Sequence, residues 1–266
     1  MQNIIEVKSW NALQEELFSD SWNPRIGRFR SRCAFRGLSD AEYKLETTLT
    51  RLGGKFWKME PHLLRNFVKY AHKNILESEP LWHWLSVAQH HGLPTRLMDW
   101  TYSPFIAMHF ATANQDKFDT DGVIWVINYV EAHLLLPEIL KNVLEREGAN
   151  AFTVDLILKA AGSFKEFSNL IEDDFVLFFE PPSLDERFIN QFALFSISSN
   201  SKLVLDDWLK LYPQLWKKVI IPKELKWEIR DKLDQSNITE RVLFPGLDGL
   251  SDWLKRMYKP KEHSES

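Results

Sequence analysis

Apolar residues along the chain follow a helical period in some segments and a strand period in others. Leu13, Leu17 and Phe18 share one helical face behind Ser9, whose hydroxyl can cap a helix over 10–18. The run GVIWVINY at 122–129 is β-branched and aromatic, which is typical of a strand. The same reasoning predicts further strands at 4–7, 33–37, 173–182, 193–200 and 217–222, and further helices at 63–76, 81–91, 104–113, 131–147, 152–161, 184–191, 223–237 and 241–259. The helix at 131–147 is expected to be broken at Pro137 or to start there.

These helices and strands follow one another irregularly, which indicates an α+β fold with a mixed sheet and flanking helices rather than a doubly wound sheet. No internal repeat, low-complexity block or Gly/Ser-rich linker divides the sequence. Its 266 residues can bury most of their apolar surface without disulfides. We therefore expect one domain at 30–256, a strand and helix extension at 1–29 packed on it, and a polar tail at 257–266.

The composition is that of an ordinary globular protein, with 44% hydrophobic and 26% charged residues. The formal charge of -4 gives no electrostatic reason to expect nucleic acid or anionic lipid, although charge alone does not exclude nucleic acid. The start, MQNIIEVKSW, lacks a signal-peptide pattern, and no window approaches the roughly 20 apolar residues of a membrane helix. With Cys33 as the single cysteine, we expect a reducing, cytoplasmic location and no membrane partner.

The stretch QHHGLPTRLMDW at 89–100 has no apolar period and predicts a loop lying against the core. An unpaired buried backbone group costs about 1 to 3 kcal/mol, so such a loop needs its own donors and acceptors. The available polar side chains are Thr95, Arg96, Asp99, Thr101 and Ser103. We expect Arg96 and Asp99 to form an internal clamp and Ser103 to cap the helix that begins at Pro104. The same stretch can form the wall of a binding cleft.

Arg36 stands at the end of a predicted strand and is followed by Gly37. A rigid backbone beneath the side chain and an open approach above it suit a binding role. The planar guanidinium matches two anionic oxygens, which points to a phosphate. The alternative is that Arg36 pairs with an internal carboxylate or with loop carbonyls.

Four histidines, His83, His90, His91 and His109, raise the question of a metal site near Asp99. His83 and His90 are seven residues apart on one predicted helix, whereas chelation by a single helix uses neighbours four apart. We therefore expect no metal. The histidines are better assigned to hydrogen bonds that line a cleft or to the protein interior.

Other motif classes are missing from the sequence. It has no phosphate-binding loop, no G-x-G-x-x-G after a strand, no H-E-x-x-H and no G-x-S-x-G. Cys33 shows no sign of activation. The segment SDSWNPRIGRFRSR at 19–32 is a polar, arginine-rich connector, and the tryptophans have mostly core-like spacing. We find no basic groove of the kind that accompanies aromatic stacking platforms for single-stranded nucleic acid.

Several blocks of the sequence resemble the FRG domain family. They are FRG at 35–37, QHHGLPTRLMDWTYSPFIAMHFA at 89–111, ERFINQFALFS at 186–196, KKVIIPKELKWEIRDKL at 217–233 and LFPGLDGLSDWL at 243–254. The third block is similar to the family's Arg-x-x-x-Gln-x-Gly-x-Phe element, with Ala193 where the family usually has glycine. The resemblance spans residues from about 30 to 255.

The order of the first three blocks is similar to that of ADP-ribosyltransferases. This similarity implies an ADP-ribosyltransferase-like core and an NAD-dependent ADP-ribosyltransferase or NAD glycohydrolase, such as a toxin or phage-defence effector. Arg36 would then bind the NAD phosphates, Thr95 and Ser103 would shape the nicotinamide pocket, and Gln191 would approach the ribose. The implied catalytic residues are Arg36, Asp99 and Gln191, and the implied NAD-binding residues are Phe35, Arg36, Gly37, His90, His91, Thr95, Arg96 and Ser103.

Cleavage of the nicotinamide bond creates an oxocarbenium-like centre, which a nearby carboxylate stabilises. Gln191 carries no charge, so the carboxylate would come from Glu180, Glu186 or Asp99, or the protein binds a nucleotide without turning it over. Two alternatives to an enzyme therefore stay open. One is a non-catalytic nucleotide-binding sensor, and the other is a protein-interaction module with an exposed aromatic surface. The sequence does not identify an acceptor of ADP-ribose.

Overall fold

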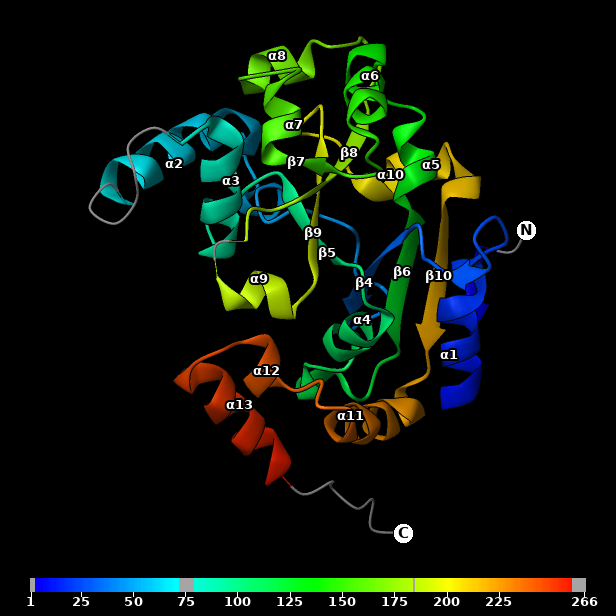
Figure 1. Ribbon diagram of the computed structural model, residues 1–266. Helices are drawn as coiled ribbons and strands as arrows, with labels where there is room; N and C mark the ends of the chain where they lie inside the picture. The colour runs from blue at the N-terminus through cyan, green and yellow to red at the C-terminus, as the bar shows by residue number, and fades with distance from the viewer. Residues whose placement is uncertain (1–2, 72–78, 184, 260–266) are drawn as a thin grey trace.

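The computed structural model describes residues 3–71, 79–183 and 185–259 (Figure 1). Within these residues, eight strands form one mixed sheet, in the order β1-β10-β6-β4-β5-β9-β8-β7. The outer pairs, β1 with β10 and β7 with β8, are parallel, and every other neighbouring pair is antiparallel. The strands of this sheet are β1 (Ile4–Glu6), β4 (Cys33–Leu38), β5 (Leu97–Thr101), β6 (Gly122–Asn128), β7 (Phe152–Thr153), β8 (Val176–Glu180), β9 (Ala193–Ser198) and β10 (Trp216–Ile221). A separate hairpin is formed by β2 (Trp22–Asn23) and β3 (Arg28–Phe29).

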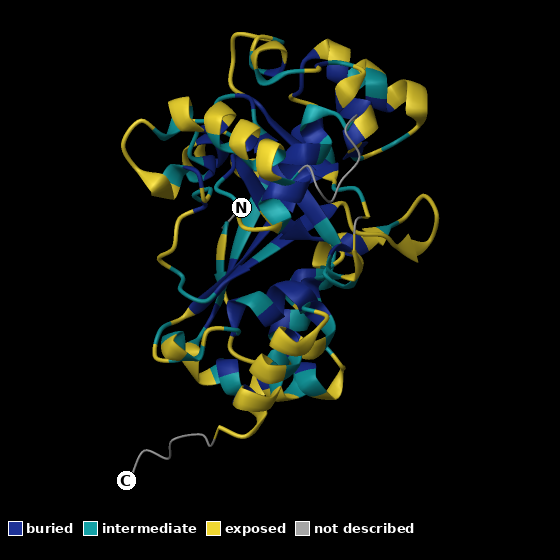
Figure 2. Ribbon diagram, turned by 90° about the vertical axis from the view of Figure 1, so that its left-hand side faces the viewer, coloured by how far each residue is buried: buried dark blue, intermediate teal, exposed yellow. Residues whose placement is uncertain are grey.

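Helices flank the sheet, as the sequence predicts for an α+β fold with a mixed sheet. Figure 2 shows the buried strands lying inside a shell of helices with exposed outer sides. The helices are α1 (Trp10–Phe18), α2 (Phe56–Ala71), α3 (Leu81–His90), α4 (Pro104–Ala111), α5 (Tyr129–His133), α6 (Glu138–Glu147), α7 (Val154–Leu158), α8 (Phe164–Ser168), α9 (Glu186–Asn190), α10 (Leu205–Lys210), α11 (Lys226–Gln235), α12 (Glu240–Leu243) and α13 (Leu247–Met257).

The core is divided between the two faces of the sheet, as β4 illustrates. Cys33 and Phe35 join a buried cluster with α1, α4 and α11. Ala34 and Leu38 point the other way and join a cluster that includes α10. Successive strand residues point to opposite faces, so this division follows directly from the strand period.

Local capping signals correctly locate several helix ends. Ser9 accepts a hydrogen bond from the backbone N–H of Ala12, and Ser103 accepts one from Ile106 at 3.5 Å. Pro104 occupies the first position of α4, where it loses no backbone hydrogen bond. These two predicted helix starts are confirmed.

Some sequence-based predictions of elements need correction, and three predictions extend beyond the described residues. Residues Leu97–Thr101 form strand β5 instead of a loop, because a strand buried on both faces shows no apolar alternation. Helix α2 begins at Phe56, before the predicted start at 63, and contains Pro61. The predicted helix at 63–76 reaches into 72–78, which lies outside the described residues, as do residue 184 of another predicted helix and 260–266 of the predicted tail.

His133 is a buried histidine that uses both ring nitrogens. Its Nδ1 lies 2.9 Å from the carbonyl oxygen of Asn150, and its Nε2 lies 2.9 Å from the backbone nitrogen of Phe178. A neutral imidazole that donates at Nδ1 and accepts at Nε2 satisfies both contacts. Burial lowers the pKa of His133 to about 4, which keeps the ring in this form at neutral pH.

Candidate functional site

The glycine of the FRG motif lies where helix α4 approaches the sheet most closely. A Cβ atom at Gly37 would lie 1.9 Å from the carbonyl oxygen of Ala107 and 2.6 Å from the backbone nitrogen of Ala111. Real Cβ atoms essentially never come within 3.0 Å of another heavy atom. Gly37 therefore has a packing role in the fold, because only a residue without a side chain lets α4 lie this close to β4.

Arg36 lies at a point where β4 and β5 part. The pair Phe35 and Thr101 is the one bridge recorded between these strands among the described residues. Beyond it, Nη1 of Arg36 donates to the carbonyl oxygen of Asp99 at 2.5 Å and lies 3.9 Å from Oδ2 of the same residue. Burial lowers the pKa of Arg36. The negative charge of Asp99 acts to raise this pKa, and the positive charge of Arg51 lowers it further. The alternative predicted for Arg36, a contact with a backbone carbonyl, is therefore present. It is accompanied by a long ion pair between Arg36 and the Asp99 carboxylate.

Asp99 presents an exposed carboxylate that is held from one side. Its side chain is 59% exposed, and Oδ2 accepts a hydrogen bond from Nε2 of Gln89 at 3.0 Å. The other end of that amide, Oε1, accepts from the hydroxyl of Thr95 at 2.6 Å. Thr95 in turn accepts from the backbone N–H of Leu97. This chain of hydrogen bonds orients the Asp99 carboxylate, and Gln89 is a residue that the sequence reasoning did not assign to the site.

The predicted clamp between Arg96 and Asp99 is wrong. Arg96 instead forms a buried ion pair with Glu60 of α2, with Nε to Oε2 at 2.7 Å and Nη2 to Oε2 at 2.5 Å. Its guanidinium also lies 4.5 Å from the ring centre of Phe164. Residues three apart along an extended chain point to opposite sides, so Arg96 and Asp99 face different surroundings. Glu60 lies 36 residues away in sequence and left no local signal.

Gln191 lies beside β5, but its side chain is used elsewhere. Its carbonyl oxygen accepts a hydrogen bond from the hydroxyl of Thr101 at 2.8 Å, two residues along the strand from Asp99. Its amide Nε2 donates to the carbonyl oxygen of Leu243 at 3.0 Å. The three predicted segments therefore meet on adjacent strands, while the amide of Gln191 points to the C-terminal helices.

A cavity of about 480 Å³ opens between α3, α9 and the segment before α13. In Figure 1, α9 lies between α3 on one side and α12 and α13 on the other. At the cavity wall, Nε2 of His90 lies 2.5 Å from Oδ2 of Asp185, and the ring of His90 packs 4.5 Å from that of Phe188. Burial lowers the pKa of His90, although Asp185 acts in the opposite direction. The lining residues are His90, Asp185, Glu186, Arg187, Phe244, Pro245, Asp248 and Gly249.

This cavity is connected to the Arg36 and Asp99 pair along the chain, although neither of these residues lines it. Gln89, which holds the Asp99 carboxylate, directly precedes His90 of the cavity wall on α3. On the opposite side, Gln191 contacts Leu243, which directly precedes Phe244 of the wall.

The two glutamates considered as catalytic carboxylates lie in different surroundings. Glu186 lines the cavity. Glu180 lies at the end of β8, where its Oε1 accepts a hydrogen bond from the hydroxyl of Tyr102 at 3.0 Å. Glu186 is thus the one of the two that lies with His90.

Several residues assigned to NAD binding are interior residues. Phe35, Thr95 and Arg96 have 1%, 1% and 6% of their surface exposed. Because these three side chains are buried, a bound ligand would contact the residues around them instead. His91 is exposed, and its ring lies edge-on to His90 at 5.1 Å.

The other two histidines that were considered as metal ligands, His83 and His109, lie apart from each other and have other partners. His83 lies 3.4 Å from Glu79, and the buried His109 has its Nδ1 2.9 Å from a guanidinium nitrogen of Arg230. Among the described residues, no group of three or more His, Cys, Asp or Glu is arranged to hold a metal ion. Burial raises the pKa of the Cys33 thiol to about 11, so it is protonated at neutral pH.

The comparison with family models assigns the central part of this architecture. Residues 31–120, which carry β4, α3, β5 and α4, match the FRG domain. The resemblance seen in the sequence is therefore confirmed over Arg36, Gly37 and the block at 89–111. Searches of curated proteins and of solved structures found no significant match to the chain.

A search of the described helices for membrane spans gave a negative result. None combines the length and the apolar character that crossing a membrane requires.

Proposed function

We propose that the FRG domain of this chain binds NAD and transfers ADP-ribose to an acceptor or to water. The observation that supports this most is the exposed carboxylate of Asp99, held by Gln89 beside the guanidinium of Arg36. An NAD molecule carries a diphosphate and a cationic nicotinamide ribose. A cation and a carboxylate side by side match these two parts.

Arg36 is the proposed diphosphate ligand. Its Nη1 is occupied by the Asp99 carbonyl, and its Nε is buried without a hydrogen-bond partner among the described residues. Because that nitrogen has almost no accessible surface, a phosphate would contact the guanidinium through its other nitrogens. Arg51 lies close enough to lower the pKa of Arg36 and adds a second positive charge.

The carboxylates act at the reacting carbon. The bond between C1′ of the ribose and the nicotinamide nitrogen breaks, and the electron pair leaves with nicotinamide. Asp99 stabilises the positive charge that develops at C1′. A hydroxyl, carboxylate or water nucleophile then attacks C1′, and Glu186 accepts its proton where it carries one. Because the cavity holds about 480 Å³, it accommodates one ring system with its ribose rather than the entire dinucleotide.

An assay of nicotinamide release from labelled NAD tests this proposal. We expect Asp99→Asn to lower the rate at least about 100-fold, the usual size of a lost charge-stabilising group. Glu180→Gln is the matched control, since that carboxylate contacts Tyr102 instead of the cavity, and its rate should stay within about twofold of wild type. Equal rates for Asp99→Asn and wild type would refute the catalytic assignment.

A non-catalytic nucleotide sensor is the second candidate, favoured by one observation. The Gln191 side chain carries no charge that could stabilise the reacting carbon, and one of its amide N–H groups donates to the carbonyl oxygen of Leu243. Saturable NAD binding without release of nicotinamide would support the sensor. Turnover of NAD would instead support the toxin or defence role implied by the resemblance, because NAD consumption depletes a central cofactor.

A further inference from the structure

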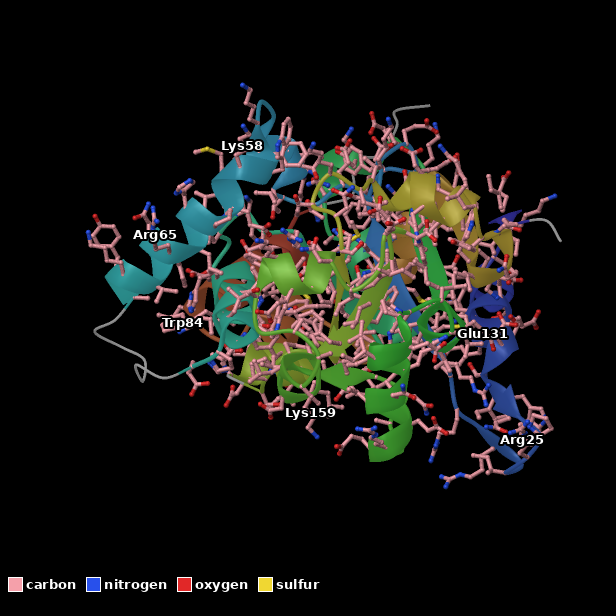
Figure 3. All side chains as sticks on the ribbon, turned by 90° about the horizontal axis from the view of Figure 1, so that it is seen from above. Arg25, Lys58, Arg65, Trp84, Glu131 and Lys159 are labelled. Carbon is pink, nitrogen blue, oxygen red and sulfur yellow. The ribbon has the colours of Figure 1, made fainter. Side chains whose placement is uncertain are left out.

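The β2 and β3 hairpin exposes aromatic side chains beside arginines. Trp22 and Phe29 are paired across the hairpin, with ring centres 5.1 Å apart, and are 52% and 63% exposed. Ile26 at the turn is 55% exposed. The four arginines of residues 22–32, a segment without any acidic residue, are Arg25, Arg28, Arg30 and Arg32. In Figure 3, Arg25 projects from the hairpin away from the body of the protein.

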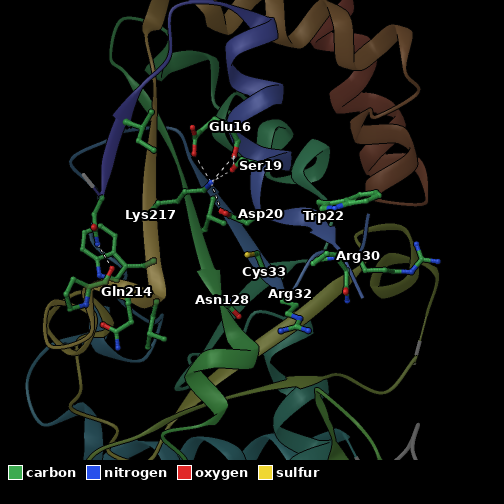
Figure 4. A pocket seen from close by; sticks show the side chains of 18 of the residues that line it. Glu16, Ser19, Asp20, Trp22, Arg30, Arg32, Cys33, Asn128, Gln214 and Lys217 are labelled. Carbon is green, nitrogen blue, oxygen red and sulfur yellow. Dashed lines mark hydrogen bonds and ion pairs between the residues drawn. The ribbon is translucent and has the colours of Figure 1, made fainter. Parts of the chain in front are cut away.

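The hairpin forms one wall of a cavity of about 1270 Å³, much larger than the one beside His90. Figure 4 shows Trp22 and Arg30 on the hairpin side, Arg32 and Asn128 near the ends of β4 and β6, and Gln214 on the opposite side. Amide side chains at such a wall offer both donors and acceptors. The cavity therefore combines aromatic surface, positive charge and groups able to contact base edges.

Among the described lining residues, the cavity has two carboxylates, and both are paired with the same lysine. The arginines of the lining therefore leave the cavity with a net positive charge. Nζ of Lys217 lies 2.7 Å from Glu16 and 2.8 Å from Asp20. Within the described residues, Arg25, Arg30 and Arg32 form no ion pair with a carboxylate. A protein with a formal charge of -4 thus keeps a local positive site at its hairpin. This is the basic groove that the sequence analysis did not find.

We propose that this hairpin and its cavity bind single-stranded nucleic acid. The arginines contact the phosphates, and bases stack on Trp22 and Phe29, which explains why both rings are exposed. Single strands fit better than duplex, because exposed ring faces need unpaired bases. The ligand is a DNA or RNA segment of a few nucleotides, and its binding does not depend on the proposed NAD site.

Fluorescence anisotropy of labelled 12-nucleotide oligo-dT and oligo-U tests the proposal, with DNA and RNA as separate arms. We expect saturable binding. The logarithm of the association constant should fall linearly with the logarithm of the salt concentration, with a slope of about -2, which corresponds to three phosphate contacts. The double variant Arg30→Gln with Arg32→Gln should bind at least about 10-fold more weakly and reduce that slope. Trp22→Ala should also weaken binding about 10-fold, and Trp22→Phe should restore most of it.

The matched control removes the same charge from another surface. Lys58 and Arg65 lie on α2, on the side of the molecule away from Arg25 (Figure 3). Lys58→Gln with Arg65→Gln should leave binding unchanged. Because the hairpin side chains are exposed, all variants should keep the wild-type melting temperature.

Four results would overturn the proposal: no saturable binding of either strand, equal loss in the α2 control, tighter binding of the matching duplex, or stronger retention by anionic phospholipid vesicles than by the oligonucleotides. Competition by inorganic phosphate or AMP at the same phosphate concentration would also overturn it, by indicating a small phosphorylated ligand. Excess NAD should not displace the strand. Loss of NAD turnover with retained strand binding would show that only the proposed enzymatic function fails.

Discussion

Replacing Gly37 by alanine is expected to disrupt the packing of α4 on the sheet. The new Cβ would lie 1.9 Å from the carbonyl oxygen of Ala107, about 1.5 Å short of the 3.4 Å at which ordinary contact begins. Because that oxygen belongs to the backbone of α4, the entire helix must shift. Ala107, Met108 and Ala111 are fully buried on that helix and would lose their close contacts.

The expected loss follows from these two effects. Overpacking of a core costs about 1 to 3 kcal/mol, and partial unpacking of buried side chains adds about as much again. The two effects together give about 2 to 6 kcal/mol, and we expect Gly37→Ala to lower the free energy of unfolding by about 3 kcal/mol. For a chain of this length, that corresponds to a fall in melting temperature of roughly 6 to 12 °C.

Thermal and urea unfolding followed by circular dichroism measure this change. Gly92→Ala is the control, since Gly92 has a φ of +80° but open space around its Cβ position. Gly92→Ala should lower the free energy of unfolding by only about 1 kcal/mol, which is typical for a residue with a side chain in the left-handed conformation. A loss for Gly37→Ala no larger than that of the control would refute the packing explanation.

Three further predictions concern stability. Glu60→Gln should cost about 3 to 5 kcal/mol in urea unfolding because it leaves buried Arg96 without its charged partner; a loss under about 1 kcal/mol would contradict this. Asp99→Asn should change stability by less than about 1 kcal/mol, since the carboxylate is 59% exposed and its Arg36 contact is long; a large fall in melting temperature would revive an interior role. His133 has a pKa of about 4 when folded, below its ordinary value of 6.5, so the unfolded state binds more protons between these values. Stability should therefore fall as pH decreases from 6.5 toward 4, by on the order of 1 kcal/mol per pH unit, and His133→Gln should flatten that dependence in unfolding titrations; an unchanged slope would count against it.

The sequence predicts elements whose signals are local. The serine before α4 and the proline at its first position determine where the helix starts, and the β-branched run at 122–129 identifies β6, because capping and strand propensity act within a few residues. Strand β5 lacks the alternation that marks a half-buried strand, because residues on both of its faces are buried and Asp99 alone is exposed.

The side-chain partners of the site depend on contacts between distant segments. Glu60 and Arg96 are 36 residues apart, and Gln191 and Leu243 are 52 apart. No spacing rule connects such pairs before the chain is folded, so Arg96 was assigned to the nearest acidic residue. Gln89 lies within the block at 89–111, but its role has no signal in the sequence, because that role follows from the approach of α3 to β5.

Calorimetric titration of NAD into the protein tests the central claim most directly. The wild-type chain should bind NAD saturably, and Arg36→Lys should bind at least about tenfold more weakly at an unchanged melting temperature, because lysine keeps the charge but not the two-pronged geometry. Absence of heat from NAD up to millimolar concentrations, or equal affinity for the two proteins, would contradict a nucleotide site at Arg36 and Asp99.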